Sequence, residues 1–232
     1  MVRLSVIIPV YNEAGTISQL LARVAAQGSG AMQIEVIAVD DASTDGTSTL
    51  LQAARSDGVQ VIRHPARRGK GAAIRAGLPR ATGDLVIIQD ADLEYDPADY
   101  GRLVAAALDH GAPVVYGSRI LGSNRSSYLR YYYGGRLVTW VFNALYGGRL
   151  TDLTTCYKLF RRDVLASLPL RCEGFEFCPE VTALLARRGV AIHEVPISYH
   201  PRSIEEGKKI RWRDGLTAIA TLFRLRWRRA VR

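Results

Sequence analysis

Strand-like and helix-like segments alternate along the first half of this sequence, and that rhythm limits the folds open to the chain. Short apolar runs rich in Val and Ile are typical of strands buried on both faces of a parallel sheet. Such runs occur at residues 4–10, 34–40, 59–63, 85–90 and 113–116, and helical patterns lie near residues 16–27, 47–55, 71–81 and 97–109. Because strand and helix take turns over about 115 residues, the sequence predicts an α/β fold: a Rossmann-like, mostly parallel sheet flanked by helices.

The rhythm changes after Gly117, where the sequence becomes rich in Tyr and Arg. Helices are expected near residues 136–146, 162–168 and 178–188, with a strand near residues 191–195. No repeat or low-complexity linker separates the halves, and 232 residues of which 48% are hydrophobic can bury one substantial core. We therefore expect one domain over residues 1–210, with functional halves at residues 1–117 and 118–210, and a tail over residues 211–232.

Three acids crowd the end of the expected strand at residues 85–90. Ligands of open α/β sheets lie beyond the carboxyl ends of the strands, which is where Asp90, Asp92 and Glu94 fall. Asp90 and Asp92 leave the strand on the same side if its two-residue period continues. Hard carboxylate oxygens select Mg²⁺ or Mn²⁺, so the cluster predicts a divalent metal that also holds a phosphate. A solvated acidic turn before the helix that Pro97 opens is the alternative.

Polar residues also close the first two strands. The first ends in Pro9-Val-Tyr-Asn-Glu13, and the second ends in Asp40 and Asp41. An acid at the end of a second strand can accept hydrogen bonds from a base or a ribose, and Tyr11 could cover a planar base. These positions favour a nucleotide ligand. The nearby Asp45 is interpreted as a turn or a helix cap.

The segment Arg67-Arg-Gly-Lys-Gly71 has the composition of a phosphate loop but not its spacing. Lys70 is not followed by Ser or Thr, as a Walker loop requires, and the third Gly of a dinucleotide fingerprint is missing. A Gly-flanked Lys at a helix start can still contact a diphosphate. An ordinary turn is the alternative.

Four motifs resemble the family 2 glycosyltransferases with a GT-A fold, and they occur in the order of that family. They are Val-Ile-Ile-Pro-Val-Tyr-Asn-Glu13, Val-Asp-Asp-Ala-Ser-Thr-Asp-Gly-Thr47, Gly-Lys-Gly-Ala-Ala-Ile-Arg-Ala-Gly77 and Asp-Ala-Asp92. Tyr-Gly-Ser-Arg119, Leu-Thr-Asp-Leu-Thr-Thr-Cys-Tyr-Lys-Leu-Phe160, Gly-Phe-Glu-Phe177 and Glu-Val-Pro-Ile-Ser-Tyr199 are similar to the dolichyl-phosphate mannose and glucose synthase branch. The resemblance spans roughly residues 3–215.

The resemblance implies a role for each matched residue. It assigns Pro9, Tyr11, Glu13 and Asp40 to the nucleoside, Asp90, Ala91 and Asp92 to the diphosphate and metal, and Glu94 to the metal. It also assigns Arg119 and Arg202 to the acceptor phosphate and the leaving diphosphate, with Lys208 as a further candidate. Arg125, Arg130 and Arg136 lie in a poorly matched segment and receive no role.

The activity implied by the resemblance is inverting transfer of one hexose from a nucleotide sugar to a polyprenyl phosphate, at the cytoplasmic membrane face. The donor is GDP-mannose, UDP-glucose or UDP-N-acetylglucosamine, and the polyprenol is dolichol or undecaprenol. An acceptor phosphate is already an anion near neutral pH and needs no general base. The four histidines, which we interpret as surface or loop residues, all lie outside the acidic cluster: His64, His110, His193 and His200.

Two other functions stay open. A hydroxyl acceptor on a glycan or lipid would require a general base, for which Asp152 and Glu176 are candidates. A catalytically inactive scaffold that binds a nucleotide sugar is the third possibility, which the intact Asp90, Asp92 and Glu94 disfavour.

The tail carries most of the net charge of +9, since residues 208–232 hold nine Lys or Arg and one acid. Its apolar residues recur three or four positions apart, which predicts one helical stripe with arginines around it. The stripe is Trp212, Leu216, Ile219, Phe223 and Trp227, and the arginines are Arg224, Arg226, Arg228 and Arg229. This amphipathic basic helix favours peripheral contact with an anionic membrane. A helix docked on the domain with a solvated basic face is the alternative.

Other partners and compartments are constrained by what the sequence lacks. No apolar stretch approaches the roughly 18 residues of a membrane span, and the start reads as a strand rather than a signal peptide. We expect a cytoplasmic protein, peripheral at the inner face of the membrane. No nucleic-acid motif accompanies the basic tail, and no signal for an oligomeric state is present. Cys156, Cys172 and Cys178 lack zinc spacing and are interpreted as structural.

Overall fold

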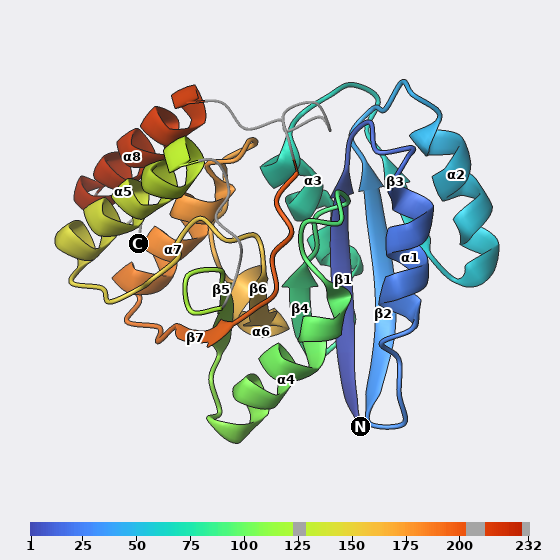
Figure 1. The fold of residues 1–232 in the computed structure, drawn as a ribbon, viewed down its shortest axis with the longest axis horizontal. Helices are drawn as coiled ribbons and strands as arrows, with labels where there is room; N and C mark the ends of the chain where they lie inside the picture. The colour runs from blue at the N-terminus through green and yellow to red at the C-terminus, as the bar shows by residue number, and fades with distance from the viewer. Residues whose placement is uncertain (123–128, 203–211, 229–232) are drawn as a thin grey trace.

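A seven-stranded sheet with helices on both faces forms the centre of the computed structural model, which describes residues 1–122, 129–202 and 212–228 (Figure 1). The strand order is β3-β2-β1-β4-β6-β5-β7. The strands are β1 Val2–Val10, β2 Met32–Asp40, β3 Gln60–Arg63, β4 Leu85–Ile88, β5 Val114–Ser118, β6 Lys158–Arg161 and β7 His193–Pro196. All pairings are parallel except those of β6, which is antiparallel to β4 and β5. The predicted α/β fold with a mostly parallel sheet is confirmed.

The helices form one layer on each face of the sheet and a further layer outside it. They are α1 Ile17–Ala25, α2 Thr47–Ala53, α3 Lys70–Gly77, α4 Tyr100–Asp109, α5 Leu129–Tyr146, α6 Arg162–Ala166, α7 Phe177–Arg187 and α8 Trp212–Trp227. Helices α1 and α4 cover one face, and α3, α6 and α7 cover the other. Helices α5 and α8 pack together on α7, away from the sheet (Figure 1).

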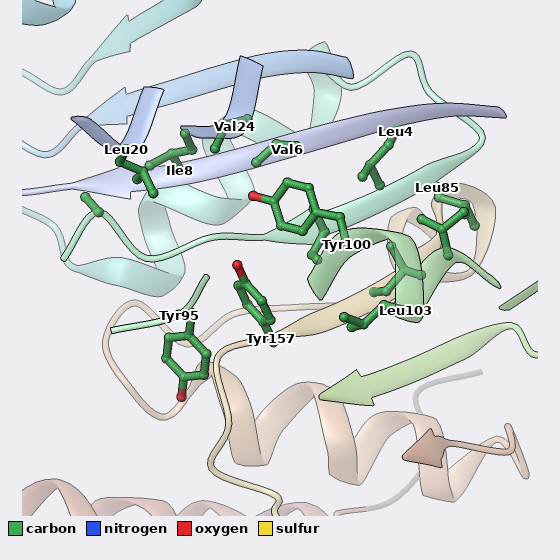
Figure 2. Packing of buried hydrophobic residues seen from close by; sticks show 14 of the residues in the cluster. Leu4, Val6, Ile8, Leu20, Val24, Leu85, Tyr95, Tyr100, Leu103 and Tyr157 are labelled. Carbon is green, nitrogen blue, oxygen red and sulfur yellow. The ribbon is translucent and has the colours of Figure 1, made fainter. Parts of the chain in front are cut away.

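Strand β1 lies at the centre of the core because helices cover it on both sides. Successive side chains of a strand point to opposite faces. Leu4, Val6 and Ile8 therefore face α1 and α4 (Figure 2), whereas Ile7 packs with Ile74 of α3 on the other face. Burial on both faces explains why β1 reads as a nearly continuous apolar run rather than an alternating one.

Two sequence expectations about strands are corrected. Strand β6 was not expected, because it has only four residues and begins with a lysine. Strand β4 ends at Ile88 rather than at residue 90. Gln89 still donates its backbone N–H to Ile7, but its side-chain oxygen is turned inward and accepts hydrogen bonds from Tyr100 and Tyr157 at 2.6 Å each. Asp90 and Asp92 therefore belong to a loop, and the period of a strand does not orient them.

The C-terminal helix is docked on the domain through one of its faces. Ala218, Leu222 and Leu225 of α8 are buried against Val138 and Phe142 of α5. The docked-helix alternative thus holds for this face, which is not the expected stripe: Trp212, Leu216, Phe223 and Trp227 of that stripe stay exposed. Among residues 1–122, 129–202 and 212–228, no helix is both long enough and apolar enough to span a membrane.

Candidate functional site

A cleft lies at the edge of the sheet where the parallel strands end. Loops that follow β1, β2, β3, β4, β5 and β7 contribute to it, together with the loop before β6, because an antiparallel strand begins at the edge where its neighbours end. Its lining comprises Pro9, Val10, Tyr11, Glu13, Asp41, Arg67, Gly69, Lys70, Ala73, Asp90, Ala91, Asp92, Glu94, Tyr95, Arg119, Thr154, Cys156, Phe175, Tyr199 and Arg202. The described residues that the sequence assigned to the nucleotide, the metal and the phosphates all line this cleft except Asp40, whereas the candidate bases Asp152 and Glu176 are not among its lining residues. Arg125, Lys208 and Arg229 lie outside the described residues.

Each acid of the expected metal cluster contacts a different partner. Asp90 forms an ion pair with Lys70. Asp92 lies 3.0 Å from Nη2 of Arg202, and Glu94 accepts hydrogen bonds from Tyr199 and from the backbone of Arg202, both at 2.8 Å. No three acid, His or Cys side chains are already arranged around a common metal position in the part of the chain described. The acids are gathered in one cleft but are held by cationic and phenolic groups.

The two aspartates differ in how easily they ionise. Burial by itself raises the pKa of Asp90, but the ammonium of Lys70, together with Cys156 and Arg202, holds the pKa below its usual value. Burial, together with the like charges of Asp90 and Glu94, raises the pKa of Asp92 to about 7. Asp92 is therefore the carboxyl of this cleft whose ionised form is opposed by burial and by two like charges, although Arg202 lies beside it.

Arg202 connects acids that follow two different strands, β1 and β4. Its two terminal nitrogens lie 3.1 and 3.2 Å from Glu13, and one of them also contacts Asp92. Its Nε is buried and has no hydrogen-bond partner among residues 1–122, 129–202 and 212–228. Such a guanidinium neutralises several carboxylates while leaving one of its own donors unsatisfied.

Lys70 begins α3 and points across the cleft. Its Nζ pairs with Asp90 and lies 2.9 Å from Sγ of Cys156. The glycines on either side of it have a packing role, since a Cβ on Gly69 would lie 2.5 Å from the carbonyl oxygen of Glu173, and one on Gly71 would lie 2.5 Å from that of Cys172. The glycines let the loop around residue 173 cross the start of α3.

Gly71→Ala is expected to lower the free energy of unfolding by about 1–3 kcal/mol, because the added methyl group meets a backbone carbonyl that cannot move independently. Gly101→Ala in α4 is the matched control, since its Cβ would meet nothing within 4 Å. That control should stabilise the helix by about 0.5–1 kcal/mol. Urea denaturation of both variants measures the difference, and equal effects would contradict the packing role of Gly71.

The two acids at the end of β2 have different surroundings. Asp40 is turned inward, where it accepts hydrogen bonds from Ser43 and Ser48 and does not line the cleft. Asp41 accepts the backbone N–H groups of Arg68 and Gly69 at 2.8 and 2.7 Å, so it shapes the loop that leads into α3. Burial opposes its ionisation, but these hydrogen bonds and His64 lower the pKa of Asp41.

Near this loop His64 departs from expectation, and Tyr11 has a cation over its ring. His64 was expected at the surface, but it is buried, with Nδ1 2.7 Å from Asp41. It lies directly after β3, and the carboxylate beside it compensates for burying an imidazole. Tyr11, expected to cover a base, has the guanidinium of Arg67 4.1 Å from its ring centroid. The outer wall of the cleft is thus a stacked cation and ring.

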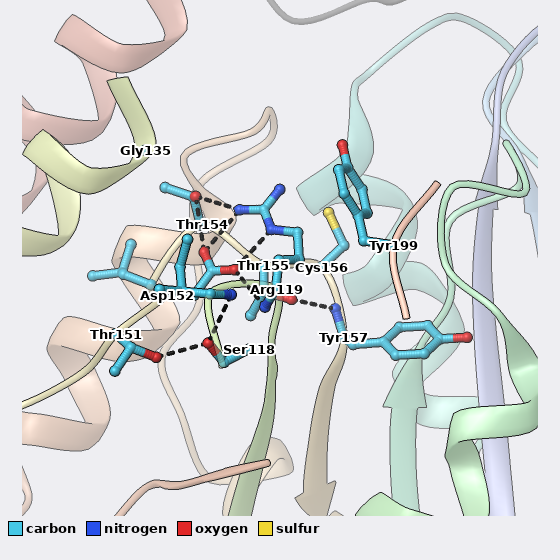
Figure 3. Close-up of polar contacts among 12 residues, drawn as sticks. Ser118, Arg119, Gly135, Thr151, Asp152, Thr154, Thr155, Cys156, Tyr157 and Tyr199 are labelled. Atoms are coloured by element: carbon cyan, nitrogen blue, oxygen red, sulfur yellow. Dashed lines mark hydrogen bonds and ion pairs between the residues drawn. The ribbon is translucent and has the colours of Figure 1, made fainter. Parts of the chain in front are cut away.

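Arg119 is held by a buried carboxylate (Figure 3). Its Nε and Nη2 each lie 2.7 Å from an oxygen of Asp152, and its backbone N–H donates to the same side chain. Nη2 also contacts Thr154 at 2.7 Å, and the guanidinium lies 5.1 Å from the ring centroid of Tyr199. Burial by itself raises the pKa of Asp152, but Arg119 outweighs it and lowers that pKa. This is the geometry of a bidentate clamp.

The candidate general bases are not presented to the cleft as free carboxylates. Both oxygens of Asp152 accept from Arg119, and its side chain is 3% exposed. Glu176 precedes α7, accepts the backbone N–H of Gly174 at 3.2 Å, and does not line the cleft.

Two residues that the sequence analysis missed lie at the start of β6 and in the loop before it. Lys158 is fully buried, donates to the carbonyls of Leu153 and Thr155, and lies 3.9 Å from the ring centroid of Tyr116. Cys156 was interpreted as structural, yet it lines the cleft beside Lys70. In the sequence, the available signal was a lysine between the large side chains of Tyr157, Leu159 and Phe160. A buried lysine at this position can donate hydrogen bonds to the carbonyl groups of the preceding loop.

A cleft with several acids and arginines at the carboxyl edge of a parallel sheet is typical of proteins that bind nucleotides or other phosphorylated ligands. The sequence model of Glycosyl transferase family 2 matches residues 5–168, which is most of the chain. This chain therefore belongs to glycosyltransferase family 2, as its motifs predicted.

Two relatives illustrate the similarity within the family. The chain is 35% identical over 209 residues to the undecaprenyl-phosphate 4-deoxy-4-formamido-L-arabinose transferase of Edwardsiella ictaluri, covering 88% of this chain and 62% of that protein. It is 31% identical over 205 residues to the low-salt glycan biosynthesis hexosyltransferase Agl6 of Haloferax volcanii, covering 87% of this chain and 49% of that protein. The chain spans less than two thirds of the length of these relatives.

Solved structures confirm the GT-A-like fold. Glucosyl-3-phosphoglycerate synthase of Mycobacterium tuberculosis, in complex with Mn²⁺, UDP and glucosyl-3-phosphoglycerate, matches with a TM-score of 0.74 and 24% identity, covering 97% of this chain and 80% of that one. The same enzyme with Mg²⁺ and UDP matches with a TM-score of 0.72 and 24% identity, covering 97% and 79%. At this identity the likeness concerns the fold alone.

Proposed function

We propose that this protein transfers one hexose from a nucleotide sugar to a polyprenyl phosphate. The observation that carries the proposal is that one cleft gathers the acids Asp90, Asp92 and Glu94 with the cations Arg119 and Arg202. Two anionic substrates can approach each other only where their charges are neutralised. The names of the two relatives, an undecaprenyl-phosphate transferase and a hexosyltransferase, support this assignment.

The donor is assigned to the loops that follow β1, β2 and β4. Pro9, Tyr11 and Glu13 would hold the nucleoside with Asp41, and Lys70 would meet the diphosphate after leaving Asp90. Asp40 acts indirectly in this proposal, because its carboxylate is engaged with Ser43 and Ser48. Residues 1–117 thus form the donor half of one catalytic domain over residues 1–210, and residues 118–210 form the acceptor half.

The acids fit a divalent cation by their chemistry. Three carboxylates on one short loop offer the hard oxygen ligands that Mg²⁺ and Mn²⁺ prefer, and Asp92 has two like charges as neighbours. Asp90, Asp92 and Glu94 would hold the ion, with the backbone of Ala91 beside the diphosphate. When bound, the ion supplies positive charge for the leaving diphosphate.

The acceptor side needs positive charge rather than a base. A phosphate monoester is already ionised near neutral pH, so its oxygen can attack the anomeric carbon in line with the leaving group, with inversion. Arg119 would orient this phosphate through charge-assisted hydrogen bonds while Asp152 fixes the guanidinium plane. A hydroxyl acceptor would need Asp152 as a base. Both oxygens of Asp152 already accept hydrogen bonds from Arg119, which disfavours this alternative.

The donor is identified by incubating the protein and Mn²⁺ with polyprenyl phosphate in detergent and labelled GDP-mannose, UDP-glucose or UDP-N-acetylglucosamine in turn. Label that passes into organic solvent from one donor supports the proposal and identifies the sugar. If no donor labels the lipid while a glycan acceptor is labelled, a hydroxyl is the acceptor. If nucleotide and metal fail to bind at all, the inactive scaffold is the better account.

Arg202→Met is expected to tighten Mn²⁺ binding to the nucleotide-free protein by about tenfold, or about 1.4 kcal/mol. The guanidinium contacts Asp92 and Glu13, so an ion that binds Asp92 must displace it. Mn²⁺ electron paramagnetic resonance measures the free ion directly. Arg161→Met is the control, because Arg161 is exposed and pairs with exposed Asp163, outside the cleft. Weaker or unchanged binding in Arg202→Met would contradict the displacement.

The C-terminal helix is assigned to peripheral contact with the inner face of the membrane, where a polyprenyl acceptor resides. Trp212 and Trp227 of α8 are 72% and 68% exposed, which supports contact with a partner that accepts aromatic side chains.

A further inference from the structure

Every exposed aromatic side chain among the described residues lies on α5 or α8. Other elements of residues 1–122, 129–202 and 212–228 expose large apolar side chains singly, as with Leu50 and Leu108. Large aromatic side chains gathered on one part of a surface indicate an interaction site.

Helix α5 carries an apolar stripe on the side opposite to its buried side. Tyr133, Leu137 and Trp140 are four and three residues apart, so they share one face of the helix, and they are 64%, 52% and 66% exposed. Val138 and Phe142, on the other side, are buried. Because both sides are apolar, the sequence of α5 gives little amphipathic signal and the stripe was not predicted.

Helix α8 has the same two-sided construction. Trp212, Leu216, Phe223 and Trp227 share its outward face, and Phe223 and Trp227 stack with ring centroids 5.5 Å apart. The buried residues Ala218, Leu222 and Leu225 lie on the opposite side.

The two stripes belong to one surface because the helices lie side by side. Tyr146 of α5 donates to the carbonyl of Leu222 at 2.8 Å, and Arg226 of α8 donates to the carbonyl of Leu145 at 2.8 Å. Both helices run in the same direction in the outermost layer (Figure 1). We call the surface formed by Tyr133, Leu137, Trp140, Trp212, Leu216, Phe223 and Trp227 the aromatic face.

The two helices of the aromatic face carry mostly positive charge. Arg136 on α5, Arg213 and Arg224 on α8 and Arg228 directly after it are exposed, and Asp214 is the one acid within α8. The acids nearest to the face, Glu173, Glu176 and Glu180, belong to α7 and the loop before it, beside Phe223 and Trp227. A second copy of the chain bound to this face would bring its own arginines against these, which is unfavourable. An anionic bilayer offers the complementary charge and an interface that accepts Trp and Tyr rings.

We propose that α5 and α8 together form a membrane-binding platform that inserts the aromatic face into the interface of an anionic bilayer. The proposal extends the membrane contact assigned above to α8. It rests on the proposed function for one point, the identity of the membrane that the protein binds. Its new element is α5, which supplies three of the seven residues of the aromatic face. The platform would also fix the orientation of the cleft relative to the lipid that supplies the acceptor.

The three tryptophans of this protein provide a direct test, since all of them lie on the aromatic face. In the Trp212→Phe/Trp227→Phe variant, Trp140 of α5 is the only tryptophan left. Its emission should shift to shorter wavelength when phosphatidylcholine vesicles containing phosphatidylglycerol are added, and brominated lipids should quench it. If the protein binds these vesicles while the emission of Trp140 stays unchanged, α5 is outside the membrane and the proposal is wrong.

Flotation with the same vesicles measures the contribution of α5 to binding. Tyr133→Ser/Leu137→Ser/Trp140→Ser should lower the partition coefficient by about tenfold or more, because membrane affinity scales with the apolar area inserted. Leu108→Ser is the matched control, since Leu108 is a similarly exposed residue of α4 and should bind as the wild type does. Equal flotation of the triple variant and the control would overturn the proposal. It would also be overturned if the wild type were a dimer and the triple variant a monomer, because the aromatic face would then be an interface between two copies of the chain. Flotation requires no sugar donor or acceptor. Its result therefore tests membrane binding even if the proposed glycosyl transfer is not found.

Discussion

Asp92→Asn is expected to lower the rate of glycosyl transfer by at least about 10³-fold while the protein stays folded. Asp92 lies between two other acids of the cleft and is the carboxyl that most needs a cation. Without its charge the metal is held poorly, and the leaving diphosphate loses its counter-charge at the moment the sugar bond breaks. A loss of this size corresponds to about 4 kcal/mol of transition-state stabilisation.

The stability of the same variant distinguishes a catalytic from a structural role. Replacing one of several crowded carboxylates with an isosteric amide removes repulsion, so the melting temperature of Asp92→Asn should not fall. Asp109→Asn, at the exposed end of α4, is the control for the loss of one negative charge. Steady-state kinetics and thermal denaturation of both variants check this. Substantial turnover by Asp92→Asn with saturating Mn²⁺ would refute the assignment of Asp92.

Asp152→Ala is expected to lower the free energy of unfolding by about 3–5 kcal/mol, because it leaves the Arg119 guanidinium, whose side chain is only 22% exposed, without its counter-charge. The two hydrogen bonds of 2.7 Å between these side chains would also be lost. Transfer should fall as well, since Arg119 would no longer be fixed toward the acceptor phosphate. Urea denaturation and kinetics measure the two effects on one preparation.

A matched ion pair at the surface serves as the control for Asp152. Arg161 and Asp163 form a pair with an N–O distance of 2.6 Å, but both side chains are more than half exposed. Asp163→Ala should leave the denaturation midpoint unchanged, because water already solvates both charges. If Asp152→Ala instead kept full stability and lost only activity, the carboxylate would be acting as a general base and the acceptor would be a hydroxyl.

Local sequence patterns were sufficient to predict the sheet and the chemical character of the cleft. Apolar runs that end in acids predicted both the strands and the edge at which Asp90, Asp92 and Glu94 gather. This succeeds because, in a parallel sheet, the ends of separate strands meet at one edge without any further information about packing. The limits of strand β4 were less accurate, because the inward turn of Gln89 depends on Tyr100 and Tyr157 from elsewhere in the fold.

Contacts between distant segments could not be predicted. Arg202 meets Glu13 across 189 positions of sequence, and no local pattern specifies that distance. Gly69 and Gly71 were interpreted as flanking a Lys that contacts a diphosphate or as part of an ordinary turn, and the structure shows that they also accommodate the loop around residue 173. The outward stripe of α5 was concealed for a related reason: a helix that is apolar on two sides has no single hydrophobic face to detect.

The most direct test of the account is a comparison of two acceptors that differ only in the phosphate. The protein is incubated with Mn²⁺ and its nucleotide-sugar donor, together with either a polyprenyl phosphate or the corresponding polyprenol, and the lipid products are measured by mass spectrometry. The account predicts a hexosyl phosphodiester from the polyprenyl phosphate and no product from the alcohol, because Arg119 and Arg202 are assigned to an anionic acceptor. Equal transfer to both lipids, or transfer to the polyprenol alone, would contradict it.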